Sequence, residues 1–353
     1  MKIRVAVAGL NRGAGFVKLF RNNEHCEVVA VCDDRPDKIA AIDGVQGFSD
    51  FDQMLDQARP DVVSIITPGP LHAPQSIRAL EAGVNVLVET PNVYSVEQAA
   101  TIVEVSRRRG LKYMLAENFV FMGWCTRLAE LFATGRFGDL IGAAGEYTHD
   151  CRGFSFADAD GQIVPLSRAG EPGVKPLWRL TDLPPLAYSS HTLGPLLALL
   201  DDRCTSVTGL CGGQCEIAGY PVYPLETAVL GTAQGRSVQL TNGFILGHPL
   251  RFVFALFGTT GAVRVDSLYQ PEATLYTATD AEGATWQTGS LPWFERTDGR
   301  DHMQVMIDAY VQSIVDDTAP PFDAARSMDF CLPGVLAHES AKAGGVRLEV
   351  PLY

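Results

Sequence analysis

The chain has 353 residues, of which 46% are hydrophobic and 20% are charged. This length predicts two domains, each with a hydrophobic core of its own. The formal net charge of −13 argues against nucleic acid and anionic membranes as partners.

The chain enters a predicted core strand with its first residues, which leaves no room for a signal peptide. Its apolar runs are too short to cross a membrane. The eight cysteines are scattered through apolar segments, as reduced thiols usually are. We therefore expect a cytoplasmic protein with no membrane partner. The His, Cys, Asp and Glu residues show no metal-ligand spacing, so no metal is expected.

The first stretch, residues 2–34, has the order strand, glycine turn, helix, strand. An apolar run ends at Gly9, the turn Gly9-Leu10-Asn11-Arg12-Gly13-Ala14-Gly15 follows, and a second apolar run ends at Asp33. This order is typical of a dinucleotide-binding βαβ unit. The alternative is a flavodoxin-like turn that binds another phosphate, or none.

The residue types of this stretch suit a dinucleotide. Glycines let backbone N–H groups and a helix N-terminus approach a pyrophosphate, and a carboxylate about 20 residues later can bind the adenosine ribose. Asp34 would repel a 2′-phosphate and favours NAD over NADP, whereas Arg35 leaves NADP open. Asn11 and Ala14 stand where glycines are usual. The residues expected to contact NAD here are Gly9, Asn11, Arg12, Gly13, Ala14, Asp33 and Asp34.

Strands and helices then alternate as far as residue 118, which predicts a parallel sheet covered on both faces. The predicted helices are 36–42, one through 54–55 capped by Ser49 or Asp50, 72–82 and 95–109; the predicted strands are 45–48, 62–66, 84–88 and 112–115.

Polar residues follow several of these strands, at the edge where ligands of parallel sheets bind. Thr67, Pro68, His72, Glu89 and Asn118 are expected at the cofactor, and Glu117 at the substrate. The alternative for His72 is a cap on the helix that it opens.

The pattern changes after about residue 120. Strands rich in Val, Thr and aromatic residues predict an α+β domain with a large, mostly antiparallel open sheet. Residues 152–185 are expected to form a loop. We expect residues 1–120 to be an NAD-binding Rossmann domain with a doubly wound parallel sheet. Residues 121–353 would bind substrate and form the oligomer, with a last helix able to pack back on the first domain. The predicted strands are 140–147, 206–210, 227–232, 237–242, 251–257 and 262–266, and the helices are 121–133, 191–200, 302–315 and 330–343.

His191 and Tyr188 are the candidate catalytic residues. A histidine titrates near neutrality, and His191 lies where a helix begins beyond a loop. Tyr188 precedes it by three residues, so a helical turn would place both side chains on one face. Its phenol could take a hydroxyl proton if its pKa were lowered. The alternatives are a histidine that satisfies the helix N-terminus and a tyrosine that only packs.

Two further pairs are candidates for substrate binding. Trp178 could stack on a sugar ring while the Arg179 guanidinium binds its oxygens, or the pair could anchor a loop. His149 and Asp150 end a predicted strand and could contact substrate or form a structural ion pair.

Several motifs together resemble the Gfo/Idh/MocA oxidoreductases. These are the glycine turn, Val31-Cys32-Asp33, Thr67-Pro68…His72, residues 79–91 ending in Glu89-Thr90-Pro91, and Gly344-Gly345…Val350-Pro351. The resemblance implies a Rossmann domain followed by a domain whose open sheet faces the substrate. The family commonly has a proton-transferring lysine where this chain has Thr90, and threonine cannot supply a cationic acid.

A second set of motifs resembles the branch that includes the NAD-dependent α-N-acetylgalactosaminidases. The set comprises Glu117-Asn118, Tyr147-Thr148-His149-Asp150, Trp178-Arg179, Tyr188-Ser189-Ser190-His191 and Leu193-Gly194-Pro195. In that branch a sugar hydroxyl is oxidised at C3, which acidifies the C2–H. A base removes this proton, the glycosidic group leaves, water adds and the hydride returns, so the net reaction is hydrolysis.

These observations predict an NAD-dependent oxidoreductase that moves hydride between the nicotinamide and a carbinol carbon of a sugar or polyol. His191 and Tyr188 would handle the proton in place of the missing lysine. One alternative is a redox-neutral glycosidase or lyase with tightly bound NAD. A second is a non-catalytic NAD-binding protein. An open sheet also predicts a homodimer or homotetramer, by analogy.

Overall fold

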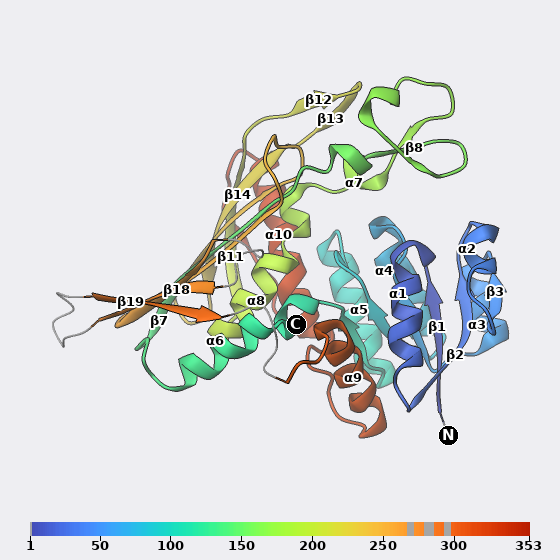
Figure 1. The fold of residues 1–353 in the computed structure, drawn as a ribbon, viewed down its shortest axis with the longest axis horizontal. Coiled ribbons are helices and arrows are strands. Elements are labelled where there is room, and N and C mark those ends of the chain that lie inside the picture. Colours follow the sequence, from blue (N-terminus) through green and yellow to red (C-terminus); the bar gives the residue numbers. More distant parts are fainter. Residues whose placement is uncertain (1, 267–271, 279–285, 293–297) are drawn as a thin grey trace. The chain divides into compact units, whose positions relative to one another are not determined.

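A computed structural model describes residues 2–266, 272–278, 286–292 and 298–353 (Figure 1). Within these residues the chain forms two compact units. Unit 1 comprises Met1–Asn118, Arg300–Met328 and Tyr353, and unit 2 comprises Phe119–Gly299 and Asp329–Leu352. Unit 1 is therefore assembled from segments that are far apart in the sequence.

Unit 1 contains a parallel sheet, which has six strands among the described residues, in the order β3-β2-β1-β4-β5-β6. Four consecutive residues of β1, Val5 to Ala8, are completely buried, as expected for a strand covered on both faces. The order reverses between β1 and β4, which is the doubly wound arrangement predicted above. The strands are β1 (Ile3–Ala8), β2 (Cys26–Cys32), β3 (Gln46–Phe48), β4 (Val62–Ile65), β5 (Asn85–Val88) and β6 (Tyr113–Leu115).

The helices of unit 1 begin and end at local signals. Asp50 caps α3, because its carboxylate accepts from the Gln53 N–H at 2.8 Å, and Gly110 ends α5 with a φ of 65°. The late helix α9 packs on α1, where the Gln304 amide donates to the Leu19 carbonyl at 3.1 Å. The helices are α1 (Leu10–Arg21), α2 (Pro36–Ala40), α3 (Phe51–Ala58), η1 (Gly69–Leu71), α4 (His72–Glu81), α5 (Val96–Arg109) and α9 (His302–Val315).

Unit 2 is built on a larger sheet, which has nine strands among the described residues, in the order β19-β18-β17-β16-β7-β15-β14-β11-β20. Among its described strands only β7 and β15 pair in parallel, which confirms the mostly antiparallel sheet expected from the sequence. The strands are β7 (Leu140–Thr148), β11 (Cys204–Cys211), β14 (Leu225–Thr232), β15 (Ser237–Gly243), β16 (Arg251–Gly258), β17 (Gly261–Val265), β18 (Glu272–Ala278), β19 (Trp286–Pro292) and β20 (Leu348–Glu349).

Helices cover one face of this sheet (Figure 1). A Cβ on Gly145 of β7 would meet Thr192 and Leu196 of α8 at 3.0 and 3.1 Å, and one on Gly209 of β11 would meet the Ala337 carbonyl of α10. Glycines on the same face of the sheet therefore let both helices lie directly on it. The helices are η2 (Asn118–Phe121), α6 (Gly123–Ala133), α8 (Ser190–Leu200) and α10 (Ala324–Lys342), and α10 begins six residues before its predicted start.

The prediction of a loop over residues 152–185 is wrong. This segment forms a small sheet of two-residue strands, and a hairpin follows later in the chain. Phe156, Val164, Leu180 and Val222 form its core. Strands this short carry no readable hydrophobic period. The elements are η3 (Arg152–Phe154), β8 (Phe156–Ala157), β9 (Ile163–Val164), η4 (Leu166–Arg168), β10 (Lys175–Pro176), α7 (Trp178–Thr181), η5 (Pro185–Tyr188), β12 (Cys215–Ile217) and β13 (Tyr220–Val222).

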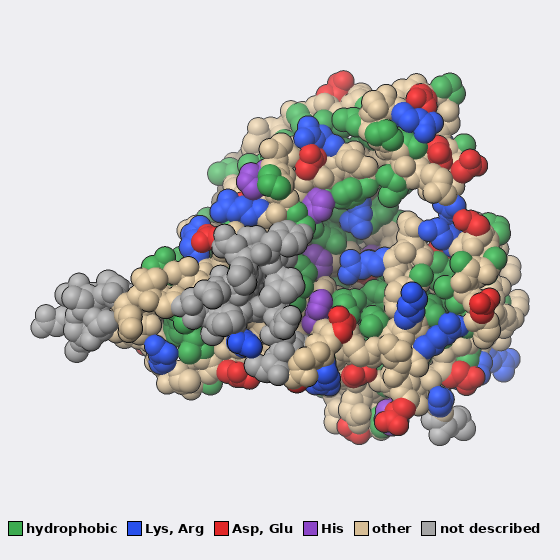
Figure 2. Space-filling model, viewed as in Figure 1, with side chains coloured by type: hydrophobic (Ala, Val, Ile, Leu, Met, Phe, Trp, Pro, Cys, Tyr) green, Lys and Arg blue, Asp and Glu red, His purple; other side chains and the backbone are tan. Residues whose placement is uncertain are grey.

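The described surface agrees with the composition. Acidic and basic side chains both lie on the face drawn in Figure 2. Within the described part of the chain, no helix is long and apolar enough to span a membrane, and no group of His, Cys, Asp and Glu could hold a metal ion.

Candidate functional site

The glycine turn of unit 1 has the close packing that a phosphate-binding turn requires. Gly9 has a φ of 84°, and a Cβ there would lie 2.5 Å from the Ile66 carbonyl oxygen, so only glycine fits. Gly13 lies against Val7, where a Cβ would come within 3.1 Å. The start of α1 is therefore held close to the carboxyl ends of β1 and β4, where a pyrophosphate binds in this fold.

Asp33 lies beside this turn at the end of β2. Its carboxylate accepts from the Leu10 N–H at 2.6 Å and from the Arg35 N–H at 3.0 Å. Partial burial, and then a hydrogen bond with Asp33, raise the pKa of the neighbouring Asp34. The buried glycine cradle and the adjacent carboxylate together fit the pyrophosphate and ribose of a dinucleotide.

Two cations lie at the same turn. The Arg12 guanidinium forms an ion pair of 2.5 Å with Glu89, which follows β5. Lys38 donates to the side-chain oxygen of Asn11 at 2.8 Å. Arg12 and Glu89, both predicted cofactor contacts, are thus neighbours across the carboxyl edge of the sheet.

The loops after β4 and β5 are joined by His72. Its two ring nitrogens lie 2.8 Å from the Pro91 carbonyl oxygen and 2.6 Å from that of Thr67. A neutral imidazole has a single N–H, so only the imidazolium could donate to both. The Thr67 hydroxyl donates to Gln75 at 2.6 Å. His72 is buried, and both of its ring nitrogens contact backbone carbonyl oxygens at this edge.

Glu117 and Asn118 follow β6 and are buried. The Asn118 amide nitrogen lies 3.2 Å from Nε2 of His302, at the start of α9. The Asn118 side-chain oxygen has no hydrogen-bond partner in the described part of the chain.

The candidate site of unit 2 is centred on the start of α8. Tyr188 is the last residue of η5, and His191 lies in the first turn of the helix. The His191 ring stacks on Phe119, with ring centroids 4.5 Å apart and an angle of 12° between the planes. Its edge contact with Tyr188 has a centroid distance of 5.2 Å. The two predicted catalytic side chains therefore lie ring to ring.

Strand β7 and the residue that follows it bring two more aromatic side chains to this cluster, Tyr147 and His149. The Tyr147 ring centroid lies 6.0 Å from that of Tyr188 and 6.2 Å from that of His191. His149, two residues later, has a pKa below its ordinary value, chiefly because it is half-buried and further because the Arg179 cation is near. His149 is therefore held neutral and can accept a proton or hydrogen bond.

Cys151 and His149 together resemble the thiol and imidazole of a nucleophilic cysteine site. The Cys151 sulfur lies 3.5 Å from Nδ1 of His149. Burial raises the pKa of Cys151 to about 12, so the group is a thiol and not the reactive thiolate. Covalent catalysis by Cys151 is not supported.

Trp178 and Arg179 complete the cluster from α7. The guanidinium carbon of Arg179 lies 4.7 Å from the Trp178 ring centroid and 6.0 Å from that of Tyr188. Trp178 also packs against the apolar group that contains Tyr188 and Phe244. The cluster offers flat aromatic surface, a cation and two imidazoles, a combination that can bind a sugar ring and transfer a proton.

Asp150 is engaged in an ion pair. Its two oxygens accept from the Arg152 guanidinium at 2.8 and 2.7 Å, and this contact lowers the pKa of Asp150. Asp150 therefore forms a structural ion pair, which was the alternative to a substrate contact.

Two aromatic residues of the cluster, Phe119 and Phe244, were not identified from the sequence. They gave no sequence signal, because each reaches the cluster from a different part of the chain.

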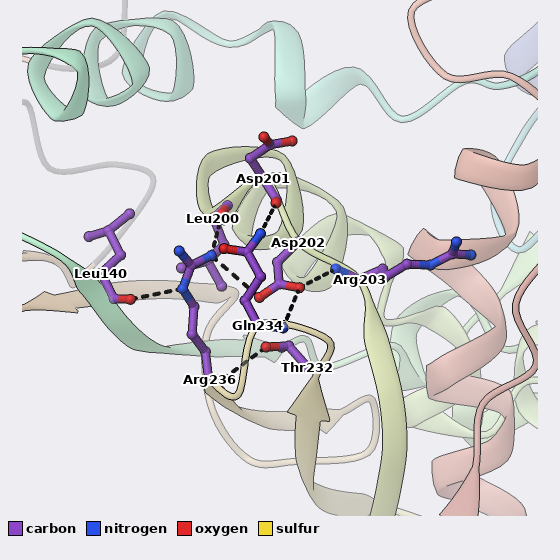
Figure 3. A network of polar contacts seen from close by, with 8 residues as sticks. All are labelled: Leu140, Leu200, Asp201, Asp202, Arg203, Thr232, Gln234 and Arg236. Carbon is purple, nitrogen blue, oxygen red and sulfur yellow. Dashed lines mark hydrogen bonds and ion pairs between the residues drawn. The ribbon is translucent and has the colours of Figure 1, made fainter.

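The far end of α8 is anchored by a polar network (Figure 3). Arg236 donates to the Leu200 carbonyl at 2.5 Å, to the Leu140 carbonyl at 2.8 Å and to the buried Asp202 carboxylate at 3.3 Å. The Gln234 amide donates to the Asp201 carbonyl at 2.7 Å. Cations and amides at a helix C-terminus satisfy its last carbonyls, so this network fixes the helix that carries His191.

Comparison with known proteins gives three findings. Residues 3–117 match the family model GFO_IDH_MocA, described as an oxidoreductase family with an NAD-binding Rossmann fold. A glycosyl hydrolase family 109 protein of Streptomyces niveus is 27% identical over 99% of this chain and 77% of its own length. An alpha-N-acetylgalactosaminidase of Bacteroides fragilis is 23% identical over 73% of this chain and 67% of its own length.

Solved structures share the fold of the chain. A levoglucosan dehydrogenase, in complex with NADH and levoglucosan, superposes with a TM-score of 0.79 at 16% identity over 100% of both chains. An NAD-binding oxidoreductase from Klebsiella pneumoniae gives 0.78 at 17% identity, over 99% of this chain and 100% of the other. At these identities the likeness concerns fold alone.

Proposed function

We propose that this chain is an enzyme that acts on a sugar or sugar-like polyol, because residues 3–117 match the NAD-binding Rossmann model of the Gfo/Idh/MocA oxidoreductase family. When bound, NAD would supply the redox chemistry, as the acceptor or donor of the hydride of a carbinol carbon. The proposal is carried by the unit 2 cluster, in which His191 and Tyr188 lie ring to ring beside a cation and an indole.

Each part of the chain has a role in this proposal. In unit 1, the turn from Gly9 to Gly13 would bind the pyrophosphate and Asp33 the adenosine ribose. In unit 2, Trp178 and Arg179 would hold the sugar. His191 would take the carbinol proton as a general base, with the Tyr188 phenol beside it to share that proton. Unit 1 would thus be the cofactor domain and unit 2 the substrate domain.

A second function is favoured by Thr90. This residue is 2% exposed and occupies the position where the family commonly has its lysine. The curated relatives cited above are named as glycosidases. In a redox-neutral route, the sugar would be oxidised, lose a proton and its glycosidic group, gain water and be reduced again. Such a reaction consumes water and a glycoside, with no net change in NAD.

Cofactor content separates the two functions. The purified protein is denatured and removed, and nicotinamide nucleotides in the supernatant are measured by chromatography. Near-stoichiometric NAD or NADH supports the redox-neutral route, and glycosides with a chromogenic leaving group are then the substrates to use. An empty protein supports NAD as an exchanging cosubstrate, to be followed with sugars at the NADH absorbance. NADP in the supernatant would contradict the role given to Asp33 and Asp34. The absence of turnover in both assays would contradict an enzymatic function.

The face of the large sheet opposite α8 and α10 supports self-association. Leu210, Val229, Phe257 and Tyr276 are exposed on it by 58, 54, 43 and 38%. A shallow hollow on this face is lined by Thr208, Leu210, Thr227, Val229, Gln239 and Thr241. Exposed apolar surface of this kind marks interaction sites, and we propose a second copy of the chain, in a homodimer or homotetramer, as the partner. A cytoplasmic location stays a prediction from the sequence.

A further inference from the structure

A buried carboxylate in unit 2 lies close to the proposed catalytic pair. Glu226 of β14 is 1% exposed. One of its oxygens lies 2.6 Å from Nδ1 of His338 in α10, and the other accepts from the Leu186 N–H in η5 at 2.9 Å. A carboxylate is costly to bury unless both of its oxygens are bonded, and here they are bonded to two different elements.

The same short turn is held from two other directions. The buried Asn242 amide of β15 donates to the Pro185 carbonyl at 3.1 Å. Gly334 of α10 lies against the turn so closely that a Cβ would overlap the Leu186 carbonyl and the Ser189 hydroxyl. The backbone of η5 is thus fixed by β14, β15 and α10, and Glu226 is the charged member of this support.

The position of the η5 backbone determines where the side chains of Tyr188 and His191 lie. The Ser189 N–H donates to the Leu186 carbonyl at 3.1 Å, across Tyr188. The Ser189 carbonyl then accepts from the N–H groups of Thr192 and Leu193, at 2.9 and 2.7 Å, and so begins the helix turn that carries His191. A shift of the Leu186 backbone would therefore move both rings.

We propose that Glu226, backed by His338, is a positioning residue that holds Tyr188 and His191 in the geometry needed for proton transfer. This inference rests on the proposed function of that pair. A misplacement of about 1 Å can cost roughly 100-fold in rate. The role needs a forked side chain that bridges β14 to both α10 and η5, with an acceptor oxygen for the Leu186 N–H and a second polar atom for His338.

Two substitutions of Glu226 and one matched control test the proposal. Glu226→Ala removes both contacts, and we expect kcat to fall about 100-fold, with the Kd for NAD unchanged because the proposed NAD site is in unit 1. Glu226→Gln keeps an oxygen for the Leu186 N–H and should restore most of the wild-type kcat. Ser340→Ala is the control. It removes a buried hydroxyl of the same helix, which bonds the Gly209 N–H at 2.9 Å and the Val346 carbonyl at 2.5 Å, away from η5.

The kcat values of these variants distinguish a positioning role of Glu226 from a general effect on protein stability. A wild-type kcat in Glu226→Ala would overturn the proposal, as would equal losses of kcat in Glu226→Ala and Ser340→Ala. A Glu226→Gln variant as impaired as the alanine variant would also overturn it, since the backbone contact would then not be what matters.

Gly334→Ala is the second route if Glu226→Ala does not fold. The added methyl group pushes on η5 without removing any polar partner. We expect the same fall in kcat. Unchanged kcat would contradict the idea that the position of η5 controls the pair.

An NMR measurement is independent of turnover. The Tyr188 ring stands edge-on to His191, at 90°, so the ring protons of His191 report the position of Tyr188. Their chemical shift should change in Glu226→Ala and Gly334→Ala, and stay unchanged in Ser340→Ala. If the wild-type protein turns over no substrate while these shifts respond as expected, the proposed function fails and the positioning role stands. Unresponsive shifts overturn the positioning role alone.

Discussion

The proposed proton transfer depends chiefly on one side chain, the imidazole of His191. His191→Ala removes the imidazole beside Tyr188, and we expect kcat to fall by about 10²–10⁴-fold, the range for loss of a general acid or base. The Kd for NAD should not change in isothermal titration. His248→Ala is the matched control, because His248 is exposed and its Nδ1 lies 2.7 Å from the carbonyl oxygen of the neighbouring Pro249. Equal activity in the two variants would remove the proton-transfer role.

Arg179 also acts on its neighbour His149. Burial is the larger cause of the lowered pKa of His149, and the Arg179 cation adds to it. Arg179→Gln should therefore raise this pKa without restoring the ordinary 6.5, as measured by NMR titration of the ring. Arg168→Gln is the control, since Arg168 pairs with Glu171. A pKa that does not move would show that Arg179 exerts no electrostatic effect there.

The same shift has a consequence for stability. The folded pKa of His149 lies below the unfolded value of 6.5, so the unfolded chain binds the proton first as the pH falls. The free energy of unfolding should decrease as pH drops below this value, and the loss should level off below the folded pKa. Arg179→Gln should lose less stability over this range than the wild-type protein.

At the scale of the element, α8 depends on the network at its C-terminus (Figure 3). Arg236→Met leaves the buried Asp202 carboxylate without its cation and the Leu200 carbonyl without its donor. We expect a loss of about 2 kcal/mol in the free energy of unfolding, since Asp202 keeps two backbone N–H donors. Urea denaturation measures this loss. Arg264→Met breaks an exposed pair with Asp266 and should change little.

Elements with a clear hydrophobic period were predictable. The strand predicted at 62–66 and the helix at 302–315 match β4 and α9, because short apolar runs and amphipathic helices leave local patterns. The two-residue strands β8 and β9 leave none. Strand β20 exists through its pairing with β11, more than a hundred residues away, which no local pattern records.

The candidate site was partly predictable for the same reason. Tyr188 and His191 share a turn, so their spacing showed that they could meet. Glu226 was missed, although it occupies an inward position of β14 together with Ala228 and Leu230. An acidic residue on the apolar side of an alternating strand is itself a signal of a buried polar contact, and it could have identified this residue.

At the scale of the molecule, the exposed sheet face is the expected contact between copies. Val229→Lys places a charge among the exposed apolar side chains of this face, and we expect it to convert the oligomer into a monomer in analytical ultracentrifugation. Ile163→Lys is the control, since Ile163 is equally exposed, at 56%, but lies in β9. A monomeric wild-type protein would contradict the oligomer.

During synthesis of the chain, unit 1 can be completed only after most of unit 2 has been made. Its helix α9 buries Tyr310 completely and bonds α1, yet it follows residues 119–299 of unit 2 in the chain. A ribosome adding about 5–20 residues per second exposes the nascent Rossmann sheet for on the order of ten seconds before α9 emerges. The nucleotide domain is therefore begun first and finished late, and a nascent chain halted after residue 118 would present chaperones and proteases with a domain whose last helix has not been made.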